Sequence, residues 1–267
     1  MNNATNIFTD NFTVFWALLQ RDLFLLKKSL RTKLIDGLFY LIPEVITFGY
    51  LMPLLGMPLD FIPPLFVGAG FVFTFFIFGY SFVMPIVHAL NRGHILNYQL
   101  TLPIPKRWLL AEYVTYFVIE TTFVSAPLII GGIIILGPLF TIVKTQWLLF
   151  LFTYLLVLVL FGLFFLHVCF NYERTWFRDN LWARRLSPLC NFSTILFSWA
   201  AVKKFSPVMS ILLLFNPITY ATEGLRAALL GGEEHLSLIY SLPALFGWIL
   251  FFCWQLARSF YKRLDPV

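Results

Sequence analysis

The sequence predicts an all-α integral membrane protein with six transmembrane helices, an N-terminal amphipathic helix at the membrane interface, and a re-entrant helical pair before the last span. Composition is the first of three observations behind this prediction. Apolar residues make up 60% of the 267 residues, charged residues only 12%, and the mean hydropathy is +0.82. Soluble domains carry about a quarter charged residues. A soluble fold is therefore excluded, and continuous apolar runs without alternation argue against a β-barrel.

The length of the apolar runs is the second observation. A transmembrane helix needs roughly 20 mostly apolar residues. Such runs occur at about 34–55, 61–88, 108–136, 147–170, 187–202 and 237–257. A further apolar stretch at 207–230 is interrupted by Asn216-Pro217 and carries Glu223 and Arg226. We therefore expect two short helical segments there, which dip into the membrane or lie at its surface.

The placement of Lys and Arg is the third observation, because cytoplasmic loops carry the excess of these residues. With a cytoplasmic N-terminus, fifteen of the 19 basic residues fall on the cytoplasmic side. The four on the other side are Lys144, Lys203, Lys204 and Arg226. This asymmetry predicts six spans with both termini cytoplasmic. The net charge of +6 arises at the flanks of apolar runs, so no nucleic-acid partner is expected.

Residues 10–31 precede the first span and have the pattern of a basic amphipathic helix. Their apolar residues recur at spacings of three and four, with Lys and Arg on the other face. Such a helix lies in the plane of the interface, either as an anchor or as a surface for a cytoplasmic partner. We divide the chain into a cytoplasmic N-terminus with this helix, 1–33, and one transmembrane domain, 34–267.

Signatures of enzymatic chemistry are absent from the sequence. It contains no GxxxxGK[ST], HExxH or GxSxG motif, and its three Cys and four His residues lack metal-ligand spacing. We predict no catalytic residue, no metal site and no cofactor bound by this chain.

Several residues within the predicted spans are candidates for a substrate path. Glu44 and Glu120 carry charge where charge is costly, although an interfacial position is the alternative. Phe75 and Tyr80 belong to an aromatic run, 71–80, whose rings could stack on a transported molecule. Contact with lipid and with other helices is the favoured explanation of this run.

Two segments stand out from this background: the proline-bounded loop 91–108 and the segment 215–231. With them the chain resembles the membrane subunits of ABC-2 type transporters, which are mostly bacterial exporters. Leu100 to Pro105 fits the end of that family's cytoplasmic motif, whereas Asn97, Tyr98 and Gln99 replace its acidic positions. The C-terminal motif of the family, L-N-P-[LIV]-x-Y-x-x-[ED]-x-[LF]-R-x-x-[LF]-x-G, is matched at Asn216, Pro217, Tyr220, Glu223, Arg226 and Gly231.

The resemblance implies a permease subunit of an ATP-driven exporter in the cytoplasmic membrane of a bacterium. Its substrate would be amphipathic or hydrophobic: a drug, a lipid or a lipid-linked glycan. Its partners would be a second copy or a homologous permease, membrane lipids, and a separate ATPase subunit that binds the ATP and Mg. The residues that would couple to the ATPase are Arg92, Gly93, Leu96, Leu100, Thr101, Pro103 and Pro105.

The same resemblance assigns a re-entrant gate to Asn216, Pro217, Tyr220, Glu223 and Arg226; a cap over the bundle is the structural alternative. Asn216 can cap the following helix with Pro217 at its first position. Glu223 and Arg226 are three residues apart, so they can pair on one helical face. The alternative function is that of an ion-coupled secondary transporter. A membrane-embedded enzyme is a third, less favoured alternative.

Overall fold

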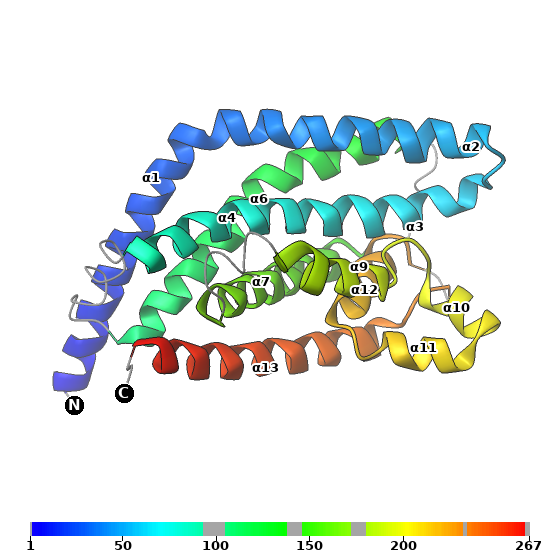
Figure 1. The fold of residues 1–267 in the computed structure, drawn as a ribbon. Helices are drawn as coiled ribbons and strands as arrows, with labels where there is room; N and C mark the ends of the chain where they lie inside the picture. Colours follow the sequence, from blue (N-terminus) through cyan, green and yellow to red (C-terminus); the bar gives the residue numbers. More distant parts are fainter. Residues whose placement is uncertain (1, 93–104, 138–145, 172–179, 232–233, 265–267) are drawn as a thin grey trace.

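The computed structural model describes residues 2–92, 105–137, 146–171, 180–231 and 234–264, and all regular elements in these ranges are helical (Figure 1). The helices are α1 (Asn2–Ile46), η1 (Thr47–Leu51), α2 (Met52–Leu54), η2 (Leu59–Phe61), α3 (Ile62–Phe66), η3 (Val67–Phe71), α4 (Val72–Arg92), α6 (Lys106–Ile135), α7 (Trp147–Asn171), η6 (Trp182–Leu186), α9 (Ser187–Asn191), α10 (Trp199–Phe205), α11 (Pro207–Leu213), α12 (Pro217–Leu229) and α13 (Leu238–Leu264). The η elements are short π-helical or 3-10 turns, and η1 and η3 continue the long helices beside them.

Within the described ranges, five helical stretches are long and apolar enough to cross a membrane. They are Asn11–Leu54, Leu59–Val87, Lys106–Ile135, Trp147–Asn171 and Leu238–Phe260. They overlap five of the six predicted spans, so the predicted class is confirmed to the extent of an all-helical fold with several helices suited to crossing a membrane. Helices α11 and α12 pass the same test only as a pair, which is bent by 99°.

The prediction of a continuous span at 187–202 is wrong. Helix α9 ends at Asn191, residues 192–198 have no regular structure, and α10 begins at Trp199. Residues 187–202 are apolar enough for a span. However, several of their backbone carbonyls accept hydrogen bonds from the side chains of Asn216 and Arg226, and not from the backbone N–H groups of a continuous helix.

The first turn of α1 and the last turn of α13 lie at the same end of the bundle (Figure 1). The long helices α1, α4, α6, α7 and α13 run along the bundle, and five passes alone would leave the two ends on opposite sides. The segment between α7 and α13 therefore carries the chain back along the bundle in short, broken pieces.

The N-terminal amphipathic stretch and the first span form one helix, α1, which changes direction along its length (Figure 1). The boundary predicted at 33/34 falls inside this helix. Leu19 and Leu26 of the amphipathic stretch are buried, whereas Phe12 and Trp16 are about half exposed. The apolar side of this stretch is therefore divided between the bundle, where α1 packs on α6, and the exterior.

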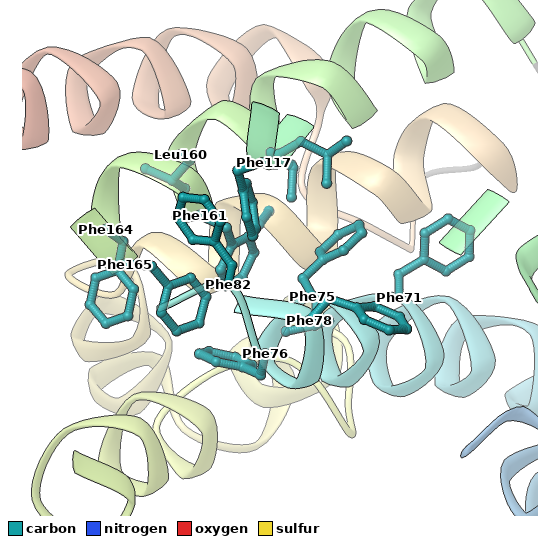
Figure 2. Close-up of a cluster of buried hydrophobic side chains, with 14 of the residues drawn as sticks. Phe71, Phe75, Phe76, Phe78, Phe82, Phe117, Leu160, Phe161, Phe164 and Phe165 are labelled. Carbon is teal, nitrogen blue, oxygen red and sulfur yellow. The ribbon is translucent and has the colours of Figure 1, made fainter. Parts of the chain in front are cut away.

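The core is built around α7, which contacts α4, α6, α12 and α13. Phenylalanines of η3 and α4 interlock with those of α7 (Figure 2). The ring of Phe161 lies 5.5 Å from that of Phe75 and 5.1 Å from that of Phe76, in tilted and edge-on geometries that aromatic pairs prefer. The packing of helices predicted for the aromatic run 71–80 is thus present in the structure.

Candidate functional site

The joint between α11 and α12 is made by Asn216 and Pro217. Asn216 has an extended backbone, and its side-chain oxygen accepts a hydrogen bond from the backbone N–H of Ile218 at 3.0 Å. Pro217 occupies the first helical position, where its missing N–H costs nothing. The predicted cap is therefore present, and it sets the start of α12 directly after the bend.

One turn and a half into α12, Glu223 and Arg226 form an ion pair with no solvent exposure. The guanidinium Nη1 donates to Glu223 Oε1 at 2.9 Å, and both side chains are 0% exposed. The carboxylate also accepts hydrogen bonds from the backbone N–H groups of Trp199, at 3.2 Å, and Leu236, at 3.0 Å. The predicted pairing is thus observed, at a depth that sequence spacing alone does not indicate.

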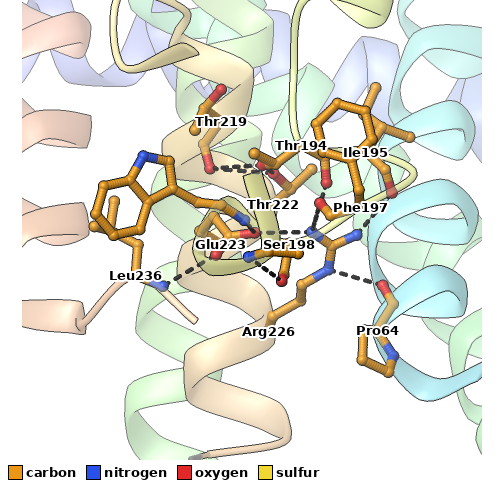
Figure 3. Close-up of polar contacts among 12 residues, drawn as sticks. Pro64, Thr194, Ile195, Phe197, Ser198, Thr219, Thr222, Glu223, Arg226 and Leu236 are labelled. Carbon is orange, nitrogen blue, oxygen red and sulfur yellow. Dashed lines mark hydrogen bonds and ion pairs between the residues drawn. The ribbon is translucent and has the colours of Figure 1, made fainter. Parts of the chain in front are cut away.

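Arg226 binds two distant chain segments with its remaining N–H groups (Figure 3). Its Nε donates to the carbonyl of Pro64 in α3 at 2.8 Å. Its Nη1 and Nη2 donate to three carbonyls of the irregular segment, those of Thr194, Ile195 and Phe197. Arg226 thereby ties α12 to α3 and to residues 192–198.

These contacts explain why the chain does not form a helix at 192–198. A non-helical backbone at membrane depth is tolerated only where its polar groups find partners inside the protein. The Arg226 guanidinium supplies donors to three carbonyls of this segment, and Asn216 Nδ2 donates to the carbonyls of Leu189 and Phe192. We call Asn216, Glu223 and Arg226 the α12 hub.

Gly68 makes this approach of three segments feasible. A Cβ atom built there would lie 2.1 Å from Arg226 Nη2 and 2.1 Å from the Ile195 carbonyl oxygen. No side chain fits at that distance, so only glycine lets η3 pass so close to the α12 hub.

The remaining residue of the predicted gate, Tyr220, is partly buried and packs on the hydrophobic core. Of the predicted coupling residues, Gly93, Leu96, Leu100, Thr101 and Pro103 lie outside the described residues. Arg92 ends α4, and Pro105 precedes α6 with an extended backbone, φ −57° and ψ 135°. Helices α4 and α6 therefore end and begin at the borders of the predicted loop.

The four residues predicted for a substrate path do not line one path. Phe75 is fully buried in the aromatic core, and Tyr80 is 42% exposed. A carboxylate oxygen of Glu44 lies 3.2 Å from the position that a Cβ of Gly70 would occupy, so this side chain faces η3. Glu120 alone among the four borders the large cavity described next.

A cavity of about 500 Å³ lies between α1, α4 and α6. An ion pair between Lys33 of α1 and Glu120 of α6 forms part of its wall, and a second pair joins the neighbouring residues Arg21 and Asp22 at 2.7 Å. The other lining residues are Leu25, Ser81, Phe82, Pro85, Ile86, Tyr113 and Tyr116. We call this space the α1–α6 cavity.

Sequence reasoning missed most of this cavity. Asp22, Lys33 and Tyr116 were not singled out, although Tyr113, Tyr116 and Glu120 recur at spacings of three and four on one predicted helix. That spacing places them on one side of the helix and could have indicated a polar face inside an apolar segment.

No group of three or more His, Cys, Asp or Glu side chains suited to a metal ion occurs in the described part of the chain. The α12 hub contains an ion pair and hydrogen bonds that position neighbouring chain segments. The α1–α6 cavity contains paired charges and has room to bind a small molecule. Comparisons with known proteins add no identification: no protein-family model, curated protein or solved structure matches the chain.

Proposed function

We propose that this chain is the transmembrane subunit of an ATP-driven exporter of the ABC-2 type. The observation that carries the proposal is the broken helix pair α11–α12, with the α12 hub at its joint. The resemblance noted in the sequence rests on Asn216, Glu223 and Arg226, among others, and all three are buried and bonded at this joint.

A broken helix is useful in a transporter because it ends inside the bundle and can line or close a path. Discontinuous helices occupy such positions in other transport proteins. Here α12 packs on α7 and α13, while α11 extends outward with exposed apolar residues such as Ile211 and Leu212. This arrangement suits a gate in which α12 is the rigid inner helix and α11 is the peripheral outer helix.

A mechanical connection from the loop 91–105 to α12 supports the role of that loop in coupling. The loop joins α4 to α6, and both helices pack on α7. Helix α7 in turn packs on α12. A partner ATPase that displaced the loop would therefore move helices in contact with the gate. In this proposal ATP and Mg bind to the partner, and two permease subunits enclose the path of an amphipathic or hydrophobic substrate.

An ion-coupled secondary transporter is the second candidate, favoured by the partly buried Lys33–Glu120 pair. Charges inside spans often belong to ion or proton pathways. Such a protein would transport in response to an ion gradient without ATP.

The decisive experiment reconstitutes the chain with a candidate ABC ATPase subunit. We expect a stable complex in detergent and ATPase activity that depends on the permease. Arg92→Glu, at the end of α4, should abolish both. Lys203→Glu in α10 is the matched control, because it makes the same charge reversal at the opposite end of the bundle (Figure 1).

Two results would contradict the proposal. The first is an ATPase that neither binds the chain nor changes its activity in its presence. The second is uptake into proteoliposomes that contain the chain alone and are driven by a proton or sodium gradient, which would assign the secondary-transporter function.

A further inference from the structure

Helices α10 and α11 form a hairpin at the end of the bundle opposite the two termini (Figure 1). The two helices pack on each other, and each begins with a serine cap, Ser198 for α10 and Ser206 for α11. The backbone N–H of Trp199 donates to Glu223, which ties the base of the hairpin to the α12 hub. The α10–α11 hairpin is thus attached to the bundle at a fixed point.

The exposed side of this hairpin is largely apolar. Val208, Ile211 and Leu212 recur at spacings of three and four on α11, so they share one side of the helix, and each is more than half exposed. Phe205, the last residue of α10, is 92% exposed. A patch of this kind is covered in the native state by lipid or by another protein chain. The charge beside the patch distinguishes these two kinds of partner.

The hairpin carries only positive charge. Lys203 and Lys204 are both exposed in the last turn of α10, and they are the only charged residues between 187 and 222. The indole Nε1 of Trp199 donates to the Ser210 carbonyl of α11 at 2.9 Å. The Lys203 ammonium lies over the same indole, 5.0 Å from the ring centroid. Trp199 therefore holds this ammonium group beside α11.

Ammonium groups next to an apolar surface match the boundary between phospholipid headgroups and acyl chains. Basic amphipathic helices lie at this depth, and Trp and Lys suit it because each has an apolar body and a polar end. Each Lys near a negatively charged membrane surface strengthens the attraction about fivefold, an effect that a zwitterionic headgroup does not provide. The pair of lysines therefore favours anionic phospholipid over zwitterionic phospholipid.

We propose that the α10–α11 hairpin binds anionic phospholipid, with Lys203 and Lys204 at the headgroups and the exposed apolar side of α11 among the acyl chains. This binding requires neither ATP nor a transported substrate. It therefore goes beyond the function proposed above and can be tested independently of it.

The test measures which phospholipid lies beside the hairpin in proteoliposomes. Cys169, Cys190 and Cys253 are replaced by alanine, and a fluorophore is attached to Phe205→Cys, because this exposed position leaves the packing of the bundle unchanged. Phosphatidylglycerol with a nitroxide on its acyl chain quenches a fluorophore that it touches. The same measurement with nitroxide-labelled phosphatidylcholine, in the same lipid mixture, gives the preference between the two lipids.

We expect phosphatidylglycerol to associate with the site at residue 205 at least about fivefold more strongly than phosphatidylcholine. Leu250→Cys is the control position, because it is 69% exposed in the middle of α13 and should be quenched equally by both lipids. Raising the salt concentration to about 1 M should reduce the preference at residue 205, since salt screens exposed charges.

Lys203→Gln/Lys204→Gln should bring the preference at residue 205 close to one, whereas Lys203→Arg/Lys204→Arg should preserve it. Lys27→Gln/Lys28→Gln is the matched control, because it removes an adjacent pair of lysines from another helix, α1, and should leave the preference unchanged. Normal quenching at Leu250→Cys in each variant shows that the chain is inserted.

The proposal is overturned if neither lipid quenches the fluorophore at residue 205, since the hairpin would then face water or another protein chain. It is also overturned if both lipids quench it equally, or if Lys203→Gln/Lys204→Gln retains the same preference as Lys27→Gln/Lys28→Gln.

Discussion

Replacing Arg226 by Met tests whether the α12 hub holds the broken segment of the bundle. The substitution keeps an apolar side chain of similar length but removes the guanidinium. It leaves the fully buried Glu223 carboxylate without its counter-charge and four backbone carbonyls without these donors. Breaking a buried ion pair by removing one partner costs about 3–5 kcal/mol.

We expect the loss to appear as a lower Tm of the purified protein in detergent, measured by scanning fluorimetry at one fixed heating rate. For a chain of this size each kcal/mol corresponds to roughly 2–4 °C. The expected decrease for Arg226→Met is therefore about 6–20 °C. Glu223→Gln should cost less, about 1–3 kcal/mol, because Arg226 retains its carbonyl partners.

The double variant Glu223→Gln/Arg226→Met provides the sharper test. Because no bare carboxylate remains in it, its Tm should decrease by less than the sum of the two single decreases. Arg258→Met on the exposed face of α13 is the control for loss of an arginine. The reasoning fails if Arg226→Met behaves like Arg258→Met, or if the two single effects add fully in the double variant.

Two further predictions concern the surroundings of the hub. Gly68→Ala should lower the Tm, because the added Cβ would lie 2.1 Å from both Arg226 and Ile195. The control is Gly247→Ala in α13, whose added Cβ meets no atom within 4 Å and should leave the Tm equal or higher. If the two variants changed the Tm equally, the close approach at Gly68 would be refuted. Burial lowers the pKa of His235, which lies between α12 and α13, so the unfolded chain binds the proton more readily than the folded one. Stability should therefore fall as the pH decreases below the ordinary histidine pKa of about 6.5, and His235→Gln should reduce this dependence in thermal scans at several pH values.

Local chemistry was sufficient to predict the features that depend on neighbouring residues. The apolar run of α7 was predicted at 147–170 and is found at Trp147–Asn171. Asn216 and Pro217 specify a cap and a first turn within two positions, and Glu223 and Arg226 share a face because of helical spacing. Each of these features is determined within a few residues of the chain.

Features that depend on distant residues could not be predicted in this way. Residues 187–202 are apolar enough to span, but their helix ends at Asn191 because donors from Asn216 and Arg226 bind their carbonyls. Likewise, Glu120 was recognised as an unusual charge, but its partner Lys33 is 87 residues away. Such pairings become visible only when the helices are placed side by side.

The contacts of Arg226 also have a consequence for the synthesis of the chain. A ribosome delivers residues in order from the N-terminus, and the acceptors of the Arg226 guanidinium among the described residues all precede it in the sequence: Pro64, Thr194, Ile195, Phe197 and Glu223. An arginine that enters the bilayer alone is among the most costly side chains to insert. Here its partners have already been made when it emerges, so the order of translation itself favours insertion of α12 against a prepared surface.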